Sequence, residues 1–452
     1  MVYEKSVSLL TLNTWGLKYV SKHRKERLRA IAERLSRGEY DVVALQEIWV
    51  EEDWAYLEEA CRSVYPYRRR FSSGILTGPG LALLSKLPVE RTFLYRFPIN
   101  GRPSAFFRGD WFVGKSVAIT LLHPRTGAAS ADGAAKTPAA APLAVLNSHM
   151  HAPYAQTGDA AYAAHRACQA WDLAQLVRTL KRAGYAVVQV GDLNSKPGSL
   201  PHKLFTAEAG LMDSWEAVHG VVPPDELAAL PAPEQIVRGG VTCDSRLNTW
   251  RSMRAPWEAC RLDYALVDAH RVRPVSAAVR FTEPLPPPLS CSCSDHFGYS
   301  FEFVQQAPAN FGADDDDPAL VAARLEAYRE LLAEIRRYLT YTIPFQAGWR
   351  RAHFFVSVLL VVVINVGISF ASNVRAWASV LLSVASTLIG ITGVVNGMIW
   401  FFAVRSESRA LNEVRMEVED AQAALKQRSA YMDIEIEDQG LGRQAAGVPF
   451  ED

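Results

Sequence analysis

The sequence predicts a layered α and β domain followed by two helices that cross a membrane. From residue 2 to about residue 303, short β-branched runs alternate with amphipathic stretches, a pattern typical of sheets covered by helices. Two long apolar segments follow, at residues 354–372 and 377–404. The length of 452 residues suggests two or three domains at roughly 150 residues each, although β-rich domains of about 250 residues are common.

The first 308 residues are expected to form one domain in which seven strands and three helices are recognisable. The strands are short, mostly apolar runs at residues 6–13, 42–46, 81–85, 116–122, 143–149, 186–190 and 263–267. The helices are amphipathic stretches at residues 22–36, 54–64 and 162–181. Residues 126–142 are rich in Ala, Gly and Pro, which predicts a flexible insertion without chemistry of its own.

Residues 353–404 are expected to form a transmembrane hairpin. At 1.5 Å per residue, each apolar segment can cross a hydrocarbon core of about 30 Å. A pair of buried core helices is the alternative, but apolarity on every face over such lengths argues against it. Gly393 and Gly397 form a GxxxG face, which packing within the hairpin and association of two copies explain equally well.

A hairpin places the segments on either side of it on the same side of the membrane. Residues 309–352, a linker and juxtamembrane helix, and residues 405–452, a helix and tail, carry many arginines, whereas Arg375 alone lies in the connection. Because positively charged flanks stay in the cytosol, the domain and both termini are predicted to be cytosolic. The apolar stripe of the tail helix favours packing on the helix at 318–339 over binding to a lipid surface.

The formal net charge is zero, with 48 basic and 48 acidic side chains, which argues against a polycation that wraps nucleic acid. The balance is uneven, because residues 1–308 hold 35 basic and 30 acidic side chains, and residues 309–452 hold 13 and 18. Six dispersed cysteines indicate reduced thiols rather than a disulfide framework. The N-terminus shows a strand-like pattern, so no signal peptide is expected.

Polar residues that bind metals and phosphates follow several of the expected strands. They are Asn13, Glu47, Asn147, His149, His151, Asp192, Asn194, Asp263, Asp295 and His296. Each alone has an ordinary explanation, such as a turn cap or an ion pair, and a lone short match is more often chance than site. Five such segments in chain order, each directly after an apolar strand, indicate one site at the strand ends.

The residue types predict a metal and a general base. Oxygen ligands without Cys point to Mg²⁺, which bridges carboxylates to a substrate phosphate. Glu47 is the best ligand candidate, with Asn13 beside it. An imidazole needs a carboxylate to fix its tautomer, and Asp263 with His296 supplies such a pair.

The phosphate and the attacking water have their own candidates. Asp192 and Asn194 are two residues apart after a strand, so both can point to one side and hold water and a phosphoryl oxygen. His149 would face the phosphate or the leaving oxygen from the other side. The predicted reaction is in-line attack of water on phosphorus, with His296 as base and the leaving group helped by the metal or by a proton from His149.

These residues resemble the endonuclease/exonuclease/phosphatase superfamily, with its deoxyribonuclease I-like fold, over residues 5 to about 303. The similarity to neutral sphingomyelinases is closer, through LNTWGL, ALQEIW, NSHMHAPY and VGDLNSKPGSLPHKLF. The segments GVTCDSRLNTWR and CRLDYALV, with the two apolar segments, most resemble fungal inositol phosphosphingolipid phospholipases C. The resemblance implies a two-sheet sandwich flanked by helices, dependence on Mg²⁺ or alternatively Mn²⁺, and hydrolysis of a sphingolipid to ceramide and a phosphorylated head group.

The resemblance also implies roles for single residues. It places Glu47 and Asn13 on metal positions, His296 on the base, Asp192 and Asn194 on phosphate and water positions, and His149 on the other active-site histidine. Asp295 is expected either to serve a second metal or to brace His296. Contacts with the substrate are expected from His151, Lys115, Lys196 and Asn147, with solvated side chains as the alternative for the lysines. An ion pair between Asp192 and Lys196 that opens for activity is a further hypothesis.

A lipid substrate calls for residues that meet the membrane. The aromatic residues Phe106, Phe107 and Trp111 suit an interfacial loop, with core packing as the alternative, and Arg68, Arg69 and Arg70 are expected to attract anionic lipid. The resemblance implies activation by phosphatidylserine or a similar anionic phospholipid. It favours the endoplasmic reticulum, with the mitochondrial outer membrane as the alternative.

Three other functions compete with a sphingolipid phospholipase C. A membrane-tethered nuclease, or another phosphodiesterase of this fold, would need a basic groove for the duplex, and no nucleic-acid partner is expected because the aromatic segment fits lipid better. A non-enzymatic tether is disfavoured because every expected active-site side chain is present. A soluble sphingomyelinase conflicts with the hairpin. Inositol phosphate and phosphocholine both stay open as head groups.

Overall fold

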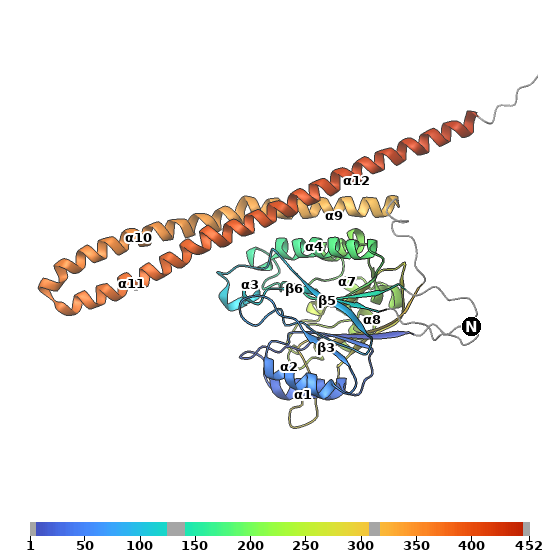
Figure 1. Cartoon of the computed structure of the whole chain (residues 1–452), viewed down its shortest axis with the longest axis horizontal. Helices are drawn as coiled ribbons and strands as arrows, with labels where there is room; N and C mark the ends of the chain where they lie inside the picture. The colour runs from blue at the N-terminus through green and yellow to red at the C-terminus, as the bar shows by residue number, and fades with distance from the viewer. Residues whose placement is uncertain (1–5, 124–140, 307–316, 446–452) are drawn as a thin grey trace, which may run out of the picture. The chain divides into compact units, whose positions relative to one another are not determined.

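The computed structural model describes residues 6–123, 141–306 and 317–445, with side chains described up to residue 428 (Figure 1). The predicted insertion at 126–142 and the start of the predicted linker fall largely outside the described residues. The chain divides into two compact units, one of residues 1–100 and 109–327 and the other of residues 101–108 and 328–452.

The first unit contains a six-stranded sheet with the order β11-β12-β1-β2-β4-β3. Its strands are β1 Val7–Asn13, β2 Val42–Gln46, β3 Tyr67–Arg70, β4 Ala82–Ser85, β11 Val272–Arg280 and β12 Gly298–Gln305. β1 runs parallel to β2, with Asn13 opposite Gln46, and antiparallel to β12. The end of β1 therefore lies beside the end of β2 and the start of β12.

A second six-stranded sheet has the order β5-β6-β7-β8-β10-β9. Its strands are β5 Val89–Arg96, β6 Ser116–Leu122, β7 Leu143–His149, β8 Ala186–Asp192, β9 Met212–Asp213 and β10 Asp263–Val267. β7 is parallel to β8 with His149 opposite Asp192, and β10 is antiparallel to β8 with Asp263 opposite Asp192. This register places three polar residues side by side at one edge.

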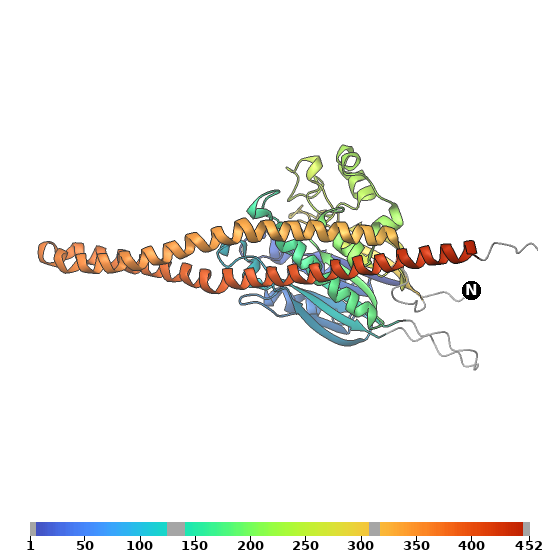
Figure 2. The ribbon, with the colours of Figure 1, turned by 90° about the horizontal axis from the view of Figure 1, so that it is seen from above.

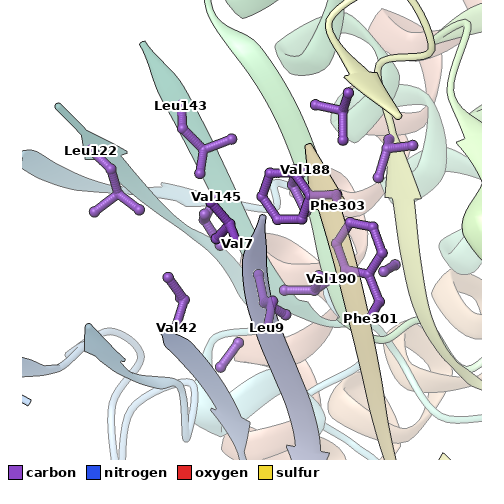
Figure 3. Close-up of a cluster of buried hydrophobic side chains, with 14 of the residues drawn as sticks. Val7, Leu9, Val42, Leu122, Leu143, Val145, Val188, Val190, Phe301 and Phe303 are labelled. Carbon is purple, nitrogen blue, oxygen red and sulfur yellow. The ribbon is translucent and has the colours of Figure 1, made fainter. Parts of the chain in front are cut away.

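The two sheets pack face to face through a core of buried apolar side chains (Figure 3). Alternate residues of a strand point to the same face, so β1 and β8 each contribute pairs two residues apart. The core includes Val7, Leu9, Val42, Val145, Val188, Val190, Phe301 and Phe303. This is the predicted sandwich of two mixed sheets, the deoxyribonuclease I-like architecture.

Helices cover the outer faces of the sandwich, with α1 and α2 on one side and α4 on the other (Figure 1). Leu28, Ile31 and Leu35 follow helical spacing on α1 and pack against the first sheet. The helices of this unit are α1 Arg24–Leu35, α2 Glu51–Cys61, α3 Asp110–Val113, α4 Ala163–Arg182, α5 Leu200–Lys203, α6 Ser214–His219, α7 Pro224–Ala229 and α8 Ala232–Gly239. None of the six cysteines forms a disulfide, as predicted, and all six are buried.

Four long helices complete the chain, and the boundary between the units falls within the first of them. They are α9 Pro318–Arg337, α10 Ile343–Val374, α11 Ala376–Met398 and α12 Arg405–Ala445. π-Helical turns at Tyr338–Thr342 and Ile399–Val404 join them into two continuous helices that are long and apolar enough to cross a membrane. Only 6% and 11% of their apolar windows are buried, unlike core helices of a soluble protein.

α10 and α11 run side by side in both views (Figure 2). Gly393 and Gly397 are buried, and a Cβ at either position would overlap Ser357 or Phe354 of α10. Asn365 Nδ2 also donates to Ser386 Oγ at 3.0 Å across the pair. The GxxxG face is therefore used inside the hairpin.

Residues 101–108 belong with the second unit through Arg102. Its Nε donates to the Tyr338 hydroxyl at 2.7 Å, and that hydroxyl donates to Glu407 Oε1 of α12 at 2.6 Å. Arg336 of α9 pairs with Glu419 of α12 at 3.1 Å. The predicted apolar stripe of the tail helix is buried at Leu411, Val414, Val418 and Leu425. These contacts support packing of the tail helix on other helices.

Candidate active site

The residues predicted to bind the metal and the phosphate and to carry out the reaction come together where several strands of the two sheets end or begin. Asn13, His149 and Asp192 are the last residues of β1, β7 and β8, and Asp263 is the first residue of β10. Glu47 follows β2 directly, and His296 lies two residues before β12. The sandwich therefore presents these side chains from both sheets at one edge.

Two carboxylates converge on the side chain of Asn13. Its Nδ2 donates to Glu47 Oε1 and to Asp192 Oδ2, each at 3.0 Å. Burial raises the pKa of Glu47, and the nearby Asp295 adds to this increase. Burial likewise raises the pKa of Asp192, to about 6, against the opposing effect of His296. Two carboxylates with raised pKa values, that of half-buried Glu47 and that of buried Asp192, form a place that favours a cation.

Oxygen donors of this kind fit Mg²⁺. The Glu47 and Asp192 carboxylates would hold the ion, whereas Asn13 presents nitrogen to them and its Oδ1 accepts from the Trp15 N–H at 3.0 Å. Asn13 could therefore serve as a metal ligand only if its side-chain amide flipped, so that Oδ1 rather than Nδ2 faced the carboxylates. Asp295 accepts from Arg251 Nη2 at 2.6 Å, so its carboxylate already has a cationic partner.

The backbone at the end of β2 is strained in a way that sets the direction of Glu47. Glu47 has a φ of 62°, in the left-handed region that side chains other than glycine seldom adopt. A Cβ at Gly16 would overlap the Glu47 carbonyl oxygen, so glycine is required there. Thr14 Oγ1 also donates to that carbonyl at 3.2 Å. Strain of this kind is typical of functional positions.

His296 and Asp263 form the predicted imidazole–carboxylate pair. His296 Nδ1 lies 2.8 Å from Asp263 Oδ2, and its Nε2 lies 3.9 Å from Asp192 Oδ2. The Cys243 sulfur is 3.6 Å from the same Nε2. Burial lowers the pKa of the imidazole, but the Cys243 sulfur and the two carboxylates outweigh burial and raise it well above its usual value.

His149 and Asn194 both lie against Asp192. His149 Nε2 is 3.5 Å from Asp192 Oδ2, and burial lowers the pKa of this histidine well below its usual value, with Lys115 adding to the effect. A neutral His149 is suited to hydrogen bonding rather than to protonating a leaving group. Asn194 donates through its backbone N–H to Asp192 Oδ1 at 3.0 Å and has a φ of 46°.

The structure separates the four residues expected to contact substrate. Lys115 and His151 are buried beside the centre, and Lys115 acts electrostatically on Glu47. Asn147 does not lie where a contact with the substrate was expected. It lies between the sheets, where its Nδ2 donates to Leu45 O and Ala82 O and its Oδ1 accepts from Gln46 Nε2. It therefore ties the sheets together and has no group left for a substrate.

Lys196 is exposed after β8, and no ion pair joins it to Asp192 among the described side chains. The structure thus gives no support to the hypothesis of an Asp192–Lys196 switch. A solvated side chain, the alternative considered for this lysine, describes its position.

The residues expected to meet the membrane fall into two groups, exposed aromatic residues and arginines with partners inside the protein. Phe106 and Phe107 are 61% and 102% exposed, as an interfacial loop requires, and Trp111 is half-buried. The three arginines do not form one patch, because successive residues of β3 point to opposite faces. Arg68 lies near Glu58, Arg70 pairs with Glu51, and Arg69 stacks over Phe71. Their charge is thus partly used within the protein.

Several residues at or near the site escaped sequence reasoning. Cys243 and Arg251 come from loops whose sequence shows no metal or phosphate pattern. Asp110 lies in the same segment as Lys115, but nothing in the spacing indicates that it contacts His151. A further cluster of His202, Asp213 and Glu216 has the geometry of a metal site. The Arg261 guanidinium already bonds both carboxylates there, so this cluster is an ion-pair network.

Comparison with known proteins agrees with this geometry. Residues 10–296 match the endonuclease/exonuclease/phosphatase family, which defines the class. The inositol phosphosphingolipids phospholipase C of Saccharomyces cerevisiae is 50% identical over 93% of this chain and 91% of that protein. The Schizosaccharomyces pombe protein of the same name is 32% identical over 94% and 97%. The chain belongs to the family of inositol phosphosphingolipid phospholipases C.

A putative neutral sphingomyelinase of Caenorhabditis elegans is 33% identical, over 67% of this chain and 68% of that protein. This match covers only about two thirds of each protein. The similarity to the yeast proteins extends further along the chain, as the sequence resemblance predicted.

Proposed function

We propose that this protein is a membrane-anchored phospholipase C that hydrolyses inositol phosphosphingolipids to ceramide and a phosphorylated head group. The observation that carries the proposal is the His296–Asp263 pair placed beside the carboxylates of Glu47 and Asp192. Identity of 50% to a yeast protein with this activity in its name supports the substrate class. Sphingomyelin is the second substrate to be tested.

His296 acts as the general base for an attacking water. Its Nδ1–H donates to Asp263 Oδ2 at 2.8 Å, which fixes the tautomer and leaves Nε2 to accept the proton. Asp192, 3.9 Å from Nε2, is placed to orient the water for attack on phosphorus. In the resting protein Cys243 lies at this nitrogen, so the water must enter between them.

Magnesium fits the Glu47 and Asp192 carboxylates, and when bound it supplies positive charge that neutralises the phosphoryl oxygens and lowers the pKa of His296. Lys115, buried beside Glu47, adds a fixed positive charge on the same side. Neutral His149 donates a hydrogen bond to the phosphate or the leaving oxygen. Whether one or two ions act depends on Asp295, whose carboxylate accepts a hydrogen bond from Arg251.

The two long apolar helices anchor the catalytic unit to the membrane that contains its substrate. We infer a cytosolic orientation from the arginines that flank the hairpin. Anionic phospholipid such as phosphatidylserine is the proposed activator, because the first 308 residues hold 35 basic and 30 acidic side chains. The endoplasmic reticulum is the proposed location.

The test compares four variants of the full chain in detergent micelles that contain inositol phosphoceramide and Mg²⁺. Glu47→Gln and His296→Asn are expected to lower kcat by at least about a hundredfold, because each removes a group that acts on the reacting atoms. Glu302→Gln and His123→Asn, both on exposed side chains, are matched controls and should keep wild-type rates. Unchanged ceramide release by the first two variants contradicts the proposal.

A further inference from the structure

A loop at residues 244–258 lies beside the general base and takes no part in the proposed reaction. It starts directly after Cys243, whose sulfur is 3.6 Å from His296 Nε2. Within the loop, Asn248 Nδ2 donates to Ser294 O at 2.9 Å, two residues before His296. The loop is therefore fixed to the segment that carries the base.

Two arginines project from the same side of this loop. Consecutive i→i+3 turns place Arg251 N 2.9 Å from Asn248 O and Arg254 N 2.9 Å from Arg251 O. Because side chains three residues apart eclipse in such turns, Arg251 and Arg254 are neighbours. Their side chains are 30% and 43% exposed, so a ligand can reach both guanidinium groups from solvent.

Acidic partners hold the two guanidinium groups without using all of their donors. Asp244 Oδ1 lies 3.6 Å from Arg251 Nε and 3.2 Å from Arg254 Nε. Arg251 Nη2 donates to Asp295 Oδ2 at 2.6 Å, and Arg254 Nη1 donates to Glu258 Oε1 at 2.8 Å. An arginine has five N–H donors, so both residues keep donors for a ligand.

The in-line geometry of the proposed reaction decides which part of the substrate meets this loop. The attacking water is bound between His296 and Asp192, and the ceramide oxygen leaves phosphorus in the opposite direction. The head-group oxygen stays on phosphorus, to the side of this line. Because the loop is fixed on the side of His296, the head group lies within its reach and the departing ceramide does not.

The donors and the acceptor of this loop suit a head group rich in hydroxyls. A hydroxyl oxygen accepts from an arginine N–H, and the same hydroxyl can donate to a carboxylate such as that of Asp244. An inositol ring has hydroxyls on adjacent carbon atoms, so it can contact both arginines and the carboxylate between them. Phosphocholine has no hydroxyl, and both guanidinium groups repel its quaternary ammonium.

We propose that Arg251 and Arg254 bind the hydroxyls of an inositol phosphate head group and thereby favour inositol phosphosphingolipids over sphingomyelin. This inference rests on the proposed function and names the residues that set its head-group preference. Arg251 also holds Asp295 beside the base. Among the described side chains Arg254 contacts only Asp244 and Glu258, so its replacement separates head-group binding from the reaction.

Arg254→Gln in the full chain is the direct test, in detergent micelles with Mg²⁺. On inositol phosphoceramide kcat/KM should fall at least about tenfold, mainly through KM, because charged hydrogen bonds to the head group are lost. On sphingomyelin it should not fall. Arg254→Lys keeps the charge without the planar fork of donors, so its loss should be smaller.

Arg238→Gln is the matched control. Arg238 pairs with Glu226 in an exposed ion pair on the same unit, and its side chain is 46% exposed, close to the value for Arg254. It contacts no residue of the candidate active site among the described side chains. Wild-type kcat/KM on both lipids is expected.

Binding of the free head groups gives a second readout that needs no turnover. Calorimetry with the full chain and Mg²⁺ measures the Kd of inositol 1-phosphate and of phosphocholine. Arg254→Gln should raise the Kd of inositol 1-phosphate at least about fivefold and should not raise that of phosphocholine. Equal losses of kcat/KM on the two lipids, or an unchanged Kd of inositol 1-phosphate, overturn the proposal.

The proposed function has a separate readout in the same experiments. If the wild type releases no ceramide from either lipid, the proposed function fails, whereas the Kd values still test the two arginines. If wild type is active and Arg254→Gln matches it on inositol phosphoceramide, the role of the arginines alone is wrong. Thermal unfolding of each variant separates a binding defect from a folding defect.

Discussion

Asp192 accepts bonds from the Asn13 amide and the Asn194 backbone and lies near both active-site histidines. Chain order predicted this gathering, because parallel strands end at the same edge and antiparallel partners begin there. The same reasoning failed to predict the position of the Asn147 side chain, which lies between the sheets. Whether its side chain points between the sheets or into the site depends on pairing register, which spacing alone does not determine.

Asp192→Asn should make the metal-free protein more stable while abolishing hydrolysis. The pKa of Asp192 rises from 3.8 to about 6 in the folded state. The folded protein thus binds this proton more tightly than the unfolded chain, so stability is lost as pH rises through that interval. At pH 8 we expect a gain of about 1–3 kcal/mol in the variant.

Thermal unfolding in EDTA at pH 4 and pH 8 measures this effect. The difference between variant and wild type should be present at pH 8 and shrink at pH 4. Asp225→Asn, on an exposed side chain, is the control. A variant that is less stable than wild type at both pH values would show that the ionised carboxylate stabilises the fold.

Several strands with buried faces on both sides were predicted closely from the sequence. The run at 116–122 coincides with β6, and 143–149 coincides with β7, because both consist of buried, largely β-branched or aliphatic residues. The four edge strands β3, β5, β9 and β11 were missed, since edge strands are short or mix exposed polar and apolar residues, and so was the inner strand β12. The arginines of β3 were consequently assigned to a single patch rather than to two faces.

Tyr338→Phe should destabilise the packing among the helices of the second unit. The hydroxyl of Tyr338 accepts from Arg102 and donates to Glu407, so its removal leaves each of them one hydrogen bond fewer in a buried setting. We expect a loss of about 1–3 kcal/mol. Tyr341→Phe is a matched control three residues away, where the side chain is 71% exposed.

Resistance to proteolysis in detergent micelles measures this change. Faster cleavage within residues 101–108 or near the start of α12 is expected for Tyr338→Phe and not for Tyr341→Phe. Equal cleavage of the two variants and of wild type would mean that the hydrogen-bonded chain contributes nothing to the packing.

The whole molecule combines a catalytic sandwich with a hairpin that is apolar enough to span a membrane. The zero net charge of the chain conceals an excess of basic groups in residues 1–308 and of acidic groups beyond them. Composition therefore predicted the two long apolar helices, because apolar runs are read directly from residue types. Contacts such as that of Cys243 with His296 depend on tertiary structure and could not be predicted.

Anionic vesicles should accelerate hydrolysis relative to neutral ones. Basic groups near an anionic surface each contribute roughly 1 kcal/mol, and this attraction weakens with ionic strength. We expect several-fold faster ceramide release with phosphatidylserine than with phosphatidylcholine at 50 mM salt, and a smaller ratio at 500 mM. Equal rates on both vesicles at low salt would contradict the proposed activation.

Hydrolysis in ¹⁸O-labelled water tests the central claim most directly. Attack of water on phosphorus, with His296 as base, places the label in the phosphorylated head group and leaves unlabelled ceramide. Mass spectrometry of both products from inositol phosphoceramide, with Glu47→Gln as the inactive control, reads this out. We predict Mg²⁺-dependent label in the head-group phosphate, whereas label in ceramide, or no ceramide at all, would contradict the account.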